Sequence, residues 1–229
     1  MLSVRPSDAR GHSQLDWLDS RHTFSFDQYH DPKHMSFGPL RVINEDVIAP
    51  GGGFGTHPHR DMEIITYVIE GQLQHKDSMG TGSIIGPGEI QKMSAGKGIF
   101  HSEFNASREK PVHLLQIWIM PNIKGLTPSY EQEKFELKPG EFKLLGSPDG
   151  QGLVSIHQNV KLYAVRIESG KAASFKMQPS AKAWVQIVKG DCAVNSEKLS
   201  AGDGAAIEPT SQIQFEASTA CEALLFEIS

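Results

Sequence analysis

Two short segments of the chain each carry a pair of side chains that commonly bind metals. The first pair is His57 and His59, separated by Pro58, and the second is His101 and Glu103, separated by Ser102. Residues two apart in a β-strand project from the same side, so each pair presents two ligand groups together. Either pair alone is a weak signal, but two pairs on two strands of one barrel predict a single four-ligand metal site.

The types of these four side chains indicate which ions would bind. Three neutral imidazoles and one carboxylate suit divalent iron, nickel, cobalt, copper or manganese, and they leave coordination positions open for exchange. Structural zinc prefers thiolates in a closed tetrahedron, and neither Cys192 nor Cys221 lies near these segments in the sequence. We therefore expect one divalent transition-metal ion with open positions, the arrangement that a catalytic centre needs.

The elements that must position this site are predicted to be strands. Short apolar runs rich in β-branched and aromatic residues alternate with turn signals, and the chain has 22 Gly and 13 Pro. Many short strands of this kind predict an all-β sandwich or closed barrel. The predicted strands include Phe24–Phe26, Met62–Ile69, Leu115–Ile119, Leu162–Ile167, Trp184–Val188 and Leu224–Ile228.

Two further details follow from the strand pattern. Phe100 and Phe104 fall on the side of their strand opposite to His101, and we expect them to enter the core. Helix is sparse, and only Pro128–Lys134 is predicted to form one short helical turn.

A weak internal repeat predicts two similar units. The strand Thr66–Glu70 followed by Gly71 resembles the strand Val185–Lys189 followed by Gly190. Between the two copies, the polar, proline-bearing stretch 127–140 is predicted to be the linker. We therefore expect an N-terminal metal-binding domain over residues 1–132 and a C-terminal domain over residues 133–229.

Composition limits the possible partners and the compartment. The formal net charge of -5 argues against direct binding of nucleic acid, which requires an excess of Lys and Arg. The polar start of the chain lacks a signal-peptide core, and no apolar run reaches membrane-spanning length. We expect a cytoplasmic protein that does not contact membranes, in which Cys192 and Cys221 are free thiols without a nucleophilic role.

Several longer motifs resemble known families. The segment from Gly51 through His57 and His59 to Glu63 resembles the first cupin motif, and Gly98, His101 and Asn105 resemble the second. More narrowly, the chain resembles the pirin family in four runs, densely from about residue 10 to 133: Trp17–Phe26, Leu40–Asp46, Gly55–Glu63 and Gln116–Pro121.

The resemblance implies a protein of two tandem cupin barrels whose N-terminal barrel holds one metal ion. By position, the pirin ligands fall on His57, His59, His101 and Glu103, and the implied ion is iron(II), with nickel, cobalt, copper, manganese or zinc as alternatives. In the general cupin pattern the carboxylate ligand comes from the first motif, here Glu63. Its spacing to Gly71 is one residue longer than that motif prefers, so we expect Glu63 to lie behind the ligands or in an ordinary strand position.

The second unit lacks an equivalent ligand set. Counted back from the glycine, Lys176 and Gln178 stand where the first unit has His57 and His59, and Ile213–Phe215 stands near the position of His101. We expect the C-terminal barrel to be free of metal.

The remaining polar residues are assigned ordinary roles. Surface or hydrogen-bonding roles are predicted for the N-terminal histidines, structural roles for the histidines of the barrel strands, and solvated loop positions for three aspartates. The glycine cluster 51–55 lacks the Gly-Lys-Ser/Thr signature of a phosphate loop and is predicted to be a turn that leads into a strand. These histidines and aspartates are His12, His22, His30, His34, His75, His113, His157, Asp46, Asp61 and Asp77.

Two classes of function are consistent with such a site. The resemblance implies a quercetin 2,3-dioxygenase-like enzyme that uses dioxygen to open the ring of a flavonol or related phenolic molecule, with Glu103 as the general base. The alternative is a metal-containing regulatory protein, either a transcriptional co-regulator or a modulator of a metabolic enzyme, which would have a protein partner. A metal-dependent isomerase is a third, weaker hypothesis, since one fold supports many chemistries.

Overall fold

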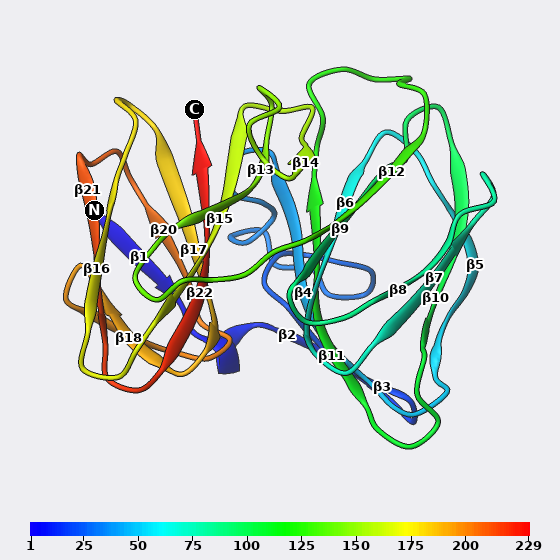
Figure 1. Ribbon diagram of the computed structural model, residues 1–229, viewed down its shortest axis with the longest axis horizontal. Helices are drawn as coiled ribbons and strands as arrows, with labels where there is room; N and C mark the ends of the chain where they lie inside the picture. The colour runs from blue at the N-terminus through cyan, green and yellow to red at the C-terminus, as the bar shows by residue number, and fades with distance from the viewer. The chain divides into compact units, whose positions relative to one another are not determined.

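The computed structural model describes all residues 1–229 and is built almost entirely of β-strands (Figure 1). It contains one short 3-10 helix, Ser7–Ala9, and therefore has no helix able to cross a membrane. The all-β prediction is confirmed. The chain divides into two compact units, one formed by residues 11–135 and the other by residues 1–10 together with 136–229.

The N-terminal unit consists of two antiparallel sheets. Its seven-stranded sheet has the order β12 (Ser129–Lys134), β9 (Glu89–Ser94), β6 (Glu63–Glu70), β11 (Val112–Ile119), β4 (Leu40–Ile48), β3 (Leu18–His22) and β2 (Gly11–Leu15). Its four-stranded sheet has the order β5 (Gly53–His59), β10 (Ile99–Asn105), β7 (Leu73–Asp77) and β8 (Gly82–Ile85).

Apolar side chains from both sheets meet inside this unit. Ile48 and Val68 come from the seven-stranded sheet, and Leu73 and Ile85 come from the four-stranded sheet. All four are at most 2% exposed. Burial of this apolar surface holds the two sheets together as a barrel.

The C-terminal unit repeats the same plan. Its seven-stranded sheet has the order β1 (Leu2–Arg5), β20 (Gly204–Ile207), β17 (Lys182–Lys189), β22 (Cys221–Ile228), β15 (Val160–Ile167), β13 (Lys143–Ser147) and β14 (Val154–Ser155). The four-stranded sheet has the order β16 (Ala172–Lys176), β21 (Gln212–Ala217), β18 (Asp191–Val194) and β19 (Glu197–Ser200). The matching strand orders of the two units agree with the weak sequence repeat.

The first strand of the chain belongs to the C-terminal unit. Strand β1 pairs with β20, with Leu2 opposite Ile207 and Arg5 opposite Gly204, and the blue N-terminal arrow lies among those strands in Figure 1. The backbone N–H of Ser7 also donates to Asp203. Strand β1 thus takes the edge beside β20 that β12 takes beside β9. The expected domains were continuous, at residues 1–132 and 133–229. In the structure the boundary lies between residues 135 and 136, and the first ten residues belong to the C-terminal unit.

Two local predictions are wrong. Pro128–Lys134 does not form a helical turn, because Ser129–Lys134 is strand β12 and completes the sheet beside β9. Part of the predicted linker is therefore strand. Phe24–Phe26 is not a strand either. Strand β3 ends at His22, and a long loop follows in which Phe24 is buried and Phe26 forms an isolated bridge with Tyr29.

Both cysteines are free thiols, as predicted. Cys192 on β18 and Cys221 on β22 are at most 2% exposed and belong to the apolar core of the C-terminal unit. A hydrogen bond with Cys192, together with burial, raises the pKa of the Cys221 thiol. Such a buried thiol is a poor nucleophile.

Candidate metal centre

Strands β5 and β10 bring three of the predicted ligands together inside the N-terminal barrel. The two strands are antiparallel, with His57 opposite His101 and His59 opposite Ile99. Nitrogens of His57, His59 and His101 lie within 4.8 Å of one another. The three ring centroids are 4.5 to 4.8 Å apart. The spacing of two residues within each strand thus produces the expected convergence.

The ring nitrogens of His57 and His101 are arranged as metal ligands require. His57 Nδ1 donates to the Gly55 carbonyl over 2.8 Å, so its Nε2 keeps a free lone pair. This Nε2 lies 3.0 Å from Nε2 of His101. Two nitrogens bound at about 2.1 Å to one ion, at right angles, would be about 3.0 Å apart. In addition, Nδ1 of His101 is buried and has no hydrogen-bond partner. These residues fit a transition-metal ion.

Burial keeps the imidazoles of His59 and His101 neutral. Desolvation, followed by the charge of His57, lowers the pKa of His59 to about 4. Desolvation, followed by the neighbouring histidines, lowers the pKa of His101 to about 2. A neutral imidazole has a lone pair to offer to a cation, whereas a protonated one does not. The barrel interior therefore holds both histidines in the metal-binding form.

Glu103 lies two residues after His101 on β10, opposite Phe54 on β5. It is 4% exposed, and both of its carboxylate oxygens accept from the side-chain amide of Gln116 over 3.0 Å. Burial, opposed by the Gln116 hydrogen bond, raises the pKa of Glu103 to about 7. Its ligand oxygen belongs to a second set, with His101 and His75, whose ligand atoms lie within 4.8 Å of one another.

The sequence predicted a structural role for His75, and the structure places it in the candidate site. It lies on β7 directly opposite Glu103, and Asp77 lies directly opposite His101. His75 is 1% exposed and its Nε2 lies 3.3 Å from the Asp77 carboxylate. The signal was available in the sequence, because His75 and Asp77 repeat the pattern of a histidine followed two residues later by an acidic residue that is seen at His101 and Glu103.

Glu63 lies on the face of the seven-stranded sheet that points away from the three histidines. On β6, Thr66 faces the interior and donates to Gln116, so Glu63, an odd number of positions away, faces outward. There Glu63 is 3.2 Å from Lys92 Nζ and accepts from Ser94 over 2.7 Å. This arrangement supports the expectation that Glu63 occupies an ordinary strand position rather than a ligand position.

Four other histidines of this unit form hydrogen bonds outside the candidate metal site. His22 contacts Asn44 and Ser13, each over 2.9 Å. His12, His34 and His113 form hydrogen bonds with the carboxylates of Asp19, Asp31 and Glu45, respectively. Their predicted hydrogen-bonding and structural roles agree with these contacts.

Two expectations about burial are wrong. Asp46 and Asp77 are 4% and 7% exposed, not solvated loop residues, because their strands turn these side chains inward. Phe100 and Phe104 are not in the core, with 55% and 38% of their surface exposed. The interior side of β10 is occupied by His101 and Glu103, so Phe100 and Phe104, which flank this pair, face solvent.

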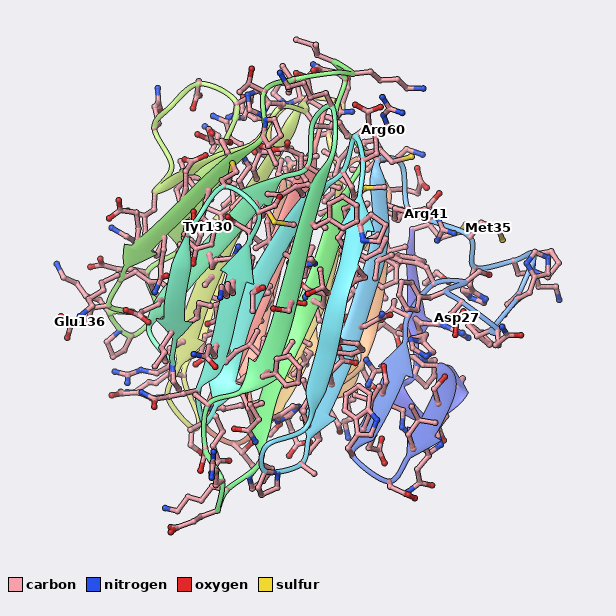
Figure 2. All side chains as sticks on the ribbon, turned by 90° about the vertical axis from the view of Figure 1, so that its right-hand side faces the viewer. Asp27, Met35, Arg41, Arg60, Tyr130 and Glu136 are labelled. Atoms are coloured by element: carbon pink, nitrogen blue, oxygen red, sulfur yellow. The ribbon has the colours of Figure 1, made fainter.

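Aromatic side chains line one flank of the three histidines. The Trp118 ring packs edge-on against His59 at 4.9 Å, and Phe26 packs against Trp118 at 5.4 Å. Phe26 belongs to the loop between β3 and β4, which Arg41 holds through bonds to the carbonyls of Ser25 and Met35. Figure 2 shows this loop projecting from the sheet, with Asp27, Met35 and Arg41 labelled.

In the C-terminal unit, apolar side chains occupy the corresponding positions. The ladder between β16 and β21 pairs Phe175 with Ile213, which correspond to His57 and His101, and Met177 then corresponds to His59. The predicted equivalents Lys176 and Gln178 are each displaced by one residue. The reason is that four residues separate Met177 from the start of β17, whereas three residues separate His59 from the start of β6. Phe175, Met177, Ile213 and Phe215 all belong to the apolar core.

Comparison with known proteins identifies the family. Residues 3–119 match the family Pirin, and residues 144–228 match the family described as the quercetinase C-terminal cupin domain. The chain belongs to the pirin family. A pirin relative from Escherichia coli K12, named quercetin 2,3-dioxygenase, is 46% identical over 229 residues, covering 100% of this chain and 99% of the relative. A relative from Pasteurella multocida, named putative quercetin 2,3-dioxygenase, is 43% identical over 100% of both chains.

Solved pirin structures share the whole fold. The crystal structure of YhhW from Escherichia coli has a TM-score of 0.96 and 46% identity, and covers 100% of this chain and 98% of its own. A second structure, of the bacterial pirin YhhW in complex with nickel(II), has a TM-score of 0.95 and 45% identity, with coverages of 100% and 99%. The prediction of two tandem cupin barrels is confirmed.

Proposed function

We propose that this pirin is a metal-dependent dioxygenase that opens the ring of a flavonol or a related phenolic molecule, in the manner of a quercetin 2,3-dioxygenase. The observation that carries the proposal is the convergence of three imidazoles beside one buried carboxylate inside a barrel. The names of the Escherichia coli and Pasteurella multocida relatives support the substrate class.

The residues proposed to hold the ion are His57, His59, His101 and Glu103. When bound, a divalent transition metal supplies Lewis-acid stabilisation of negative charge and the capacity to react with dioxygen. Iron(II) is our proposed ion, and the nickel(II) complex of the related YhhW supports the binding of a divalent transition metal by this barrel.

The side chains around the ligands have distinct proposed roles. An oxygen of Glu103 accepts the proton of the substrate hydroxyl, and Gln116 orients that carboxylate through its two hydrogen bonds. The ring of Trp118 lies against His59, and the ring of Phe26 packs against Trp118. Together they offer an aromatic surface to a flat phenolic ring. In the overall reaction both atoms of dioxygen enter the ring-opened product, one ring carbon leaves as carbon monoxide, and Glu103 returns its proton.

Oxygen uptake tests this function. Protein loaded with iron(II) should consume dioxygen when quercetin is added and release carbon monoxide. Glu103→Gln keeps a weakly coordinating amide oxygen but cannot accept the proton, so turnover should fall about a hundredfold or more while some metal is retained. Glu45→Gln, the same change on the outer face of β4, is the matched control and should retain full turnover.

Two results would count against the proposal. Unimpaired turnover by metal-loaded Glu103→Gln would exclude the base role. A fully metal-loaded wild-type protein that consumes no dioxygen with any flavonol would favour the regulatory alternative.

A further inference from the structure

Hydrogen-bond donors and acceptors inside the N-terminal barrel do not balance around His101. His57 Nδ1–H donates to the Gly55 carbonyl, so His57 Nε2 can only accept. In the ion-free barrel, the contact of 3.0 Å between the two Nε2 atoms therefore requires His101 Nε2 to carry the hydrogen. A neutral imidazole has one N–H, so Nδ1 of His101 is left with a lone pair. This Nδ1 is buried without a partner.

The same argument applies to His75. Its Nε2 faces Oδ2 of Asp77 over 3.3 Å, and a carboxylate only accepts, so Nε2 carries the hydrogen. The other oxygen of Asp77 accepts from the backbone N–H groups of Met79 and Thr81, which hold the carboxylate in place. Nδ1 of His75 therefore also has a lone pair, and it is buried without a partner.

These two nitrogens are accompanied by a carboxylate. Ligand atoms of His75, His101 and Glu103 lie within 4.8 Å of one another, and the three side chains are at most 4% exposed. The only donor to Glu103 in this cluster is the Gln116 amide, and no N–H or O–H satisfies the two nitrogens. Buried polar groups are normally paired, so three electron-pair donors gathered in this way indicate a cation.

We propose that His75, His101 and Glu103 form an inner position for a divalent metal ion. It lies next to the outer position, which the proposed function assigns to His57, His59, His101 and Glu103. Both positions use His101, through Nδ1 for the inner one and Nε2 for the outer one. Because a neutral imidazole offers one lone pair, only one of the two positions is filled at a time, and the chain binds a single ion that moves between them. His75 is thus a ligand of the inner position.

The surroundings of the inner position are those of a metal site. Metal-bound histidines usually donate their second N–H to a carboxylate or carbonyl, and ligating carboxylates are usually hydrogen-bonded. The Asp77 carboxylate accepts from His75 in this way, and the Gln116 amide donates to Glu103. Tyr130 on β12, labelled in Figure 2, packs its ring against His75, with 5.0 Å between the two ring centroids.

Cobalt(II) provides a direct test, because its visible spectrum reports the ligand set without turnover. The double variant His57→Ala/His59→Ala removes two outer ligands and leaves the inner three. It should still bind one cobalt(II) per chain, more weakly than the wild type. A cobalt-soaked crystal should show an anomalous difference peak between His75, His101 and Glu103. Adding His75→Ala should weaken the remaining binding at least tenfold, whereas adding His113→Ala, a histidine bonded to Glu45, should not change it.

Asp77→Asn is a sharper variant because it reverses the His75 tautomer. The Asn carbonyl must stay with the two backbone N–H groups, so its amide nitrogen faces His75 Nε2 and donates to it. Nδ1 of His75 then carries the hydrogen and cannot bind a cation. In the double-variant background, this change should lower cobalt(II) affinity by about 10- to 100-fold.

Two outcomes would overturn the proposal. One is a folded double variant, judged by circular dichroism, that binds no cobalt(II). The other is cobalt(II) binding in that variant that is indifferent to both His75→Ala and Asp77→Asn. If the double variant does not fold, the single variant His57→Ala replaces it, and cobalt density confined to the outer position of that variant would refute the inner one. None of these measurements involves oxygen uptake, so they stand or fall independently of the proposed dioxygenase activity.

Discussion

The side-chain amide of Gln116 lies 3.0 Å from both carboxylate oxygens of Glu103 and connects the two sheets of the N-terminal barrel. Gln116 comes from β11 in the seven-stranded sheet, and Glu103 comes from β10 in the four-stranded sheet. Thr66 donates to the Gln116 carbonyl over 3.2 Å, which leaves the amide N–H groups facing Glu103. The orientation of the carboxylate is therefore set by residues on a different sheet.

Gln116→Leu should weaken metal binding without unfolding the barrel. Leucine is of similar size but cannot donate, so Glu103 loses the groups that orient it. Residues that hold a metal ligand in this way typically affect affinity by about 10- to 100-fold. Competition with a chelator measures the change. Gln74→Leu, on the exposed side of β7, is the control, and equal affinities for the two variants would contradict the role of Gln116.

His101→Ala should abolish both metal binding and oxygen uptake. His101 belongs to both sets of ligand atoms, so no other histidine replaces it. The wild type should contain one ion per chain by elemental analysis, and the variant should be nearly empty at the same metal concentration. His12→Ala, which removes a histidine bonded to Asp19, should leave the metal content unchanged. Two ions per wild-type chain would contradict the single-ion prediction.

Gly53→Ala should disturb the site through the backbone. A Cβ at Gly53 would lie 2.3 Å from the Glu103 carbonyl oxygen and 2.5 Å from Cα of Phe104, so β5 would have to move away from β10. We expect a loss of about 1–3 kcal/mol of stability, as for overpacking, and weaker metal binding. Gly55→Ala is the matched control on the same strand, because nothing lies within 4 Å of its added Cβ. Thermal unfolding and metal titration of both variants test this prediction.

Glu63→Gln should reduce stability but not metal content. The neutral amide leaves the buried Lys92 ammonium with Glu131 as its remaining carboxylate partner in this cluster, a loss on the order of 3 kcal/mol for a broken buried pair. The ion should remain, because Glu63 lies on the opposite face of the sheet from the ligands. Urea unfolding and elemental analysis give the two readouts. A metal-free but folded variant would show that Glu63, rather than Glu103, supplies the carboxylate ligand.

Asp46→Asn should stabilise the protein above neutral pH. Burial raises the pKa of Asp46 to about 6, well above the ordinary range of an aspartate, although Ser20 donates to it over 2.5 Å. The folded state therefore binds more protons than the unfolded state between about pH 4 and pH 6. Stability linked to Asp46 is fully present below that range and is lost as the pH rises through 6.

At pH 8 the Asn variant should thus be more stable than the wild type by about 2–3 kcal/mol, and the difference should vanish near pH 4. Urea unfolding at the two pH values measures this difference. A stabilisation of equal size at both pH values would show that titration of Asp46 is not its cause.

Much of the candidate site followed from local sequence alone. The alternation of side chains along a strand places His57 with His59, and His101 with Glu103, whatever the rest of the chain does. Apolar runs between turn signals likewise predicted the strands that became β6, β11, β15, β17 and β22. These features depend on neighbours within a few residues, so they can be predicted without knowing the register between strands.

The tertiary structure decided everything that depends on pairing between distant strands. The register of β7 against β10 sets His75 opposite Glu103. The His75–Asp77 pattern is visible in the sequence, but the strand that it faces is not. Pairing also made Pro128–Lys134 largely a strand and assigned the first ten residues to the C-terminal unit. Phe100 and Phe104 face solvent because the inner side of β10 holds polar ligands, and which side of a strand is inside is determined by the sheet packed against it.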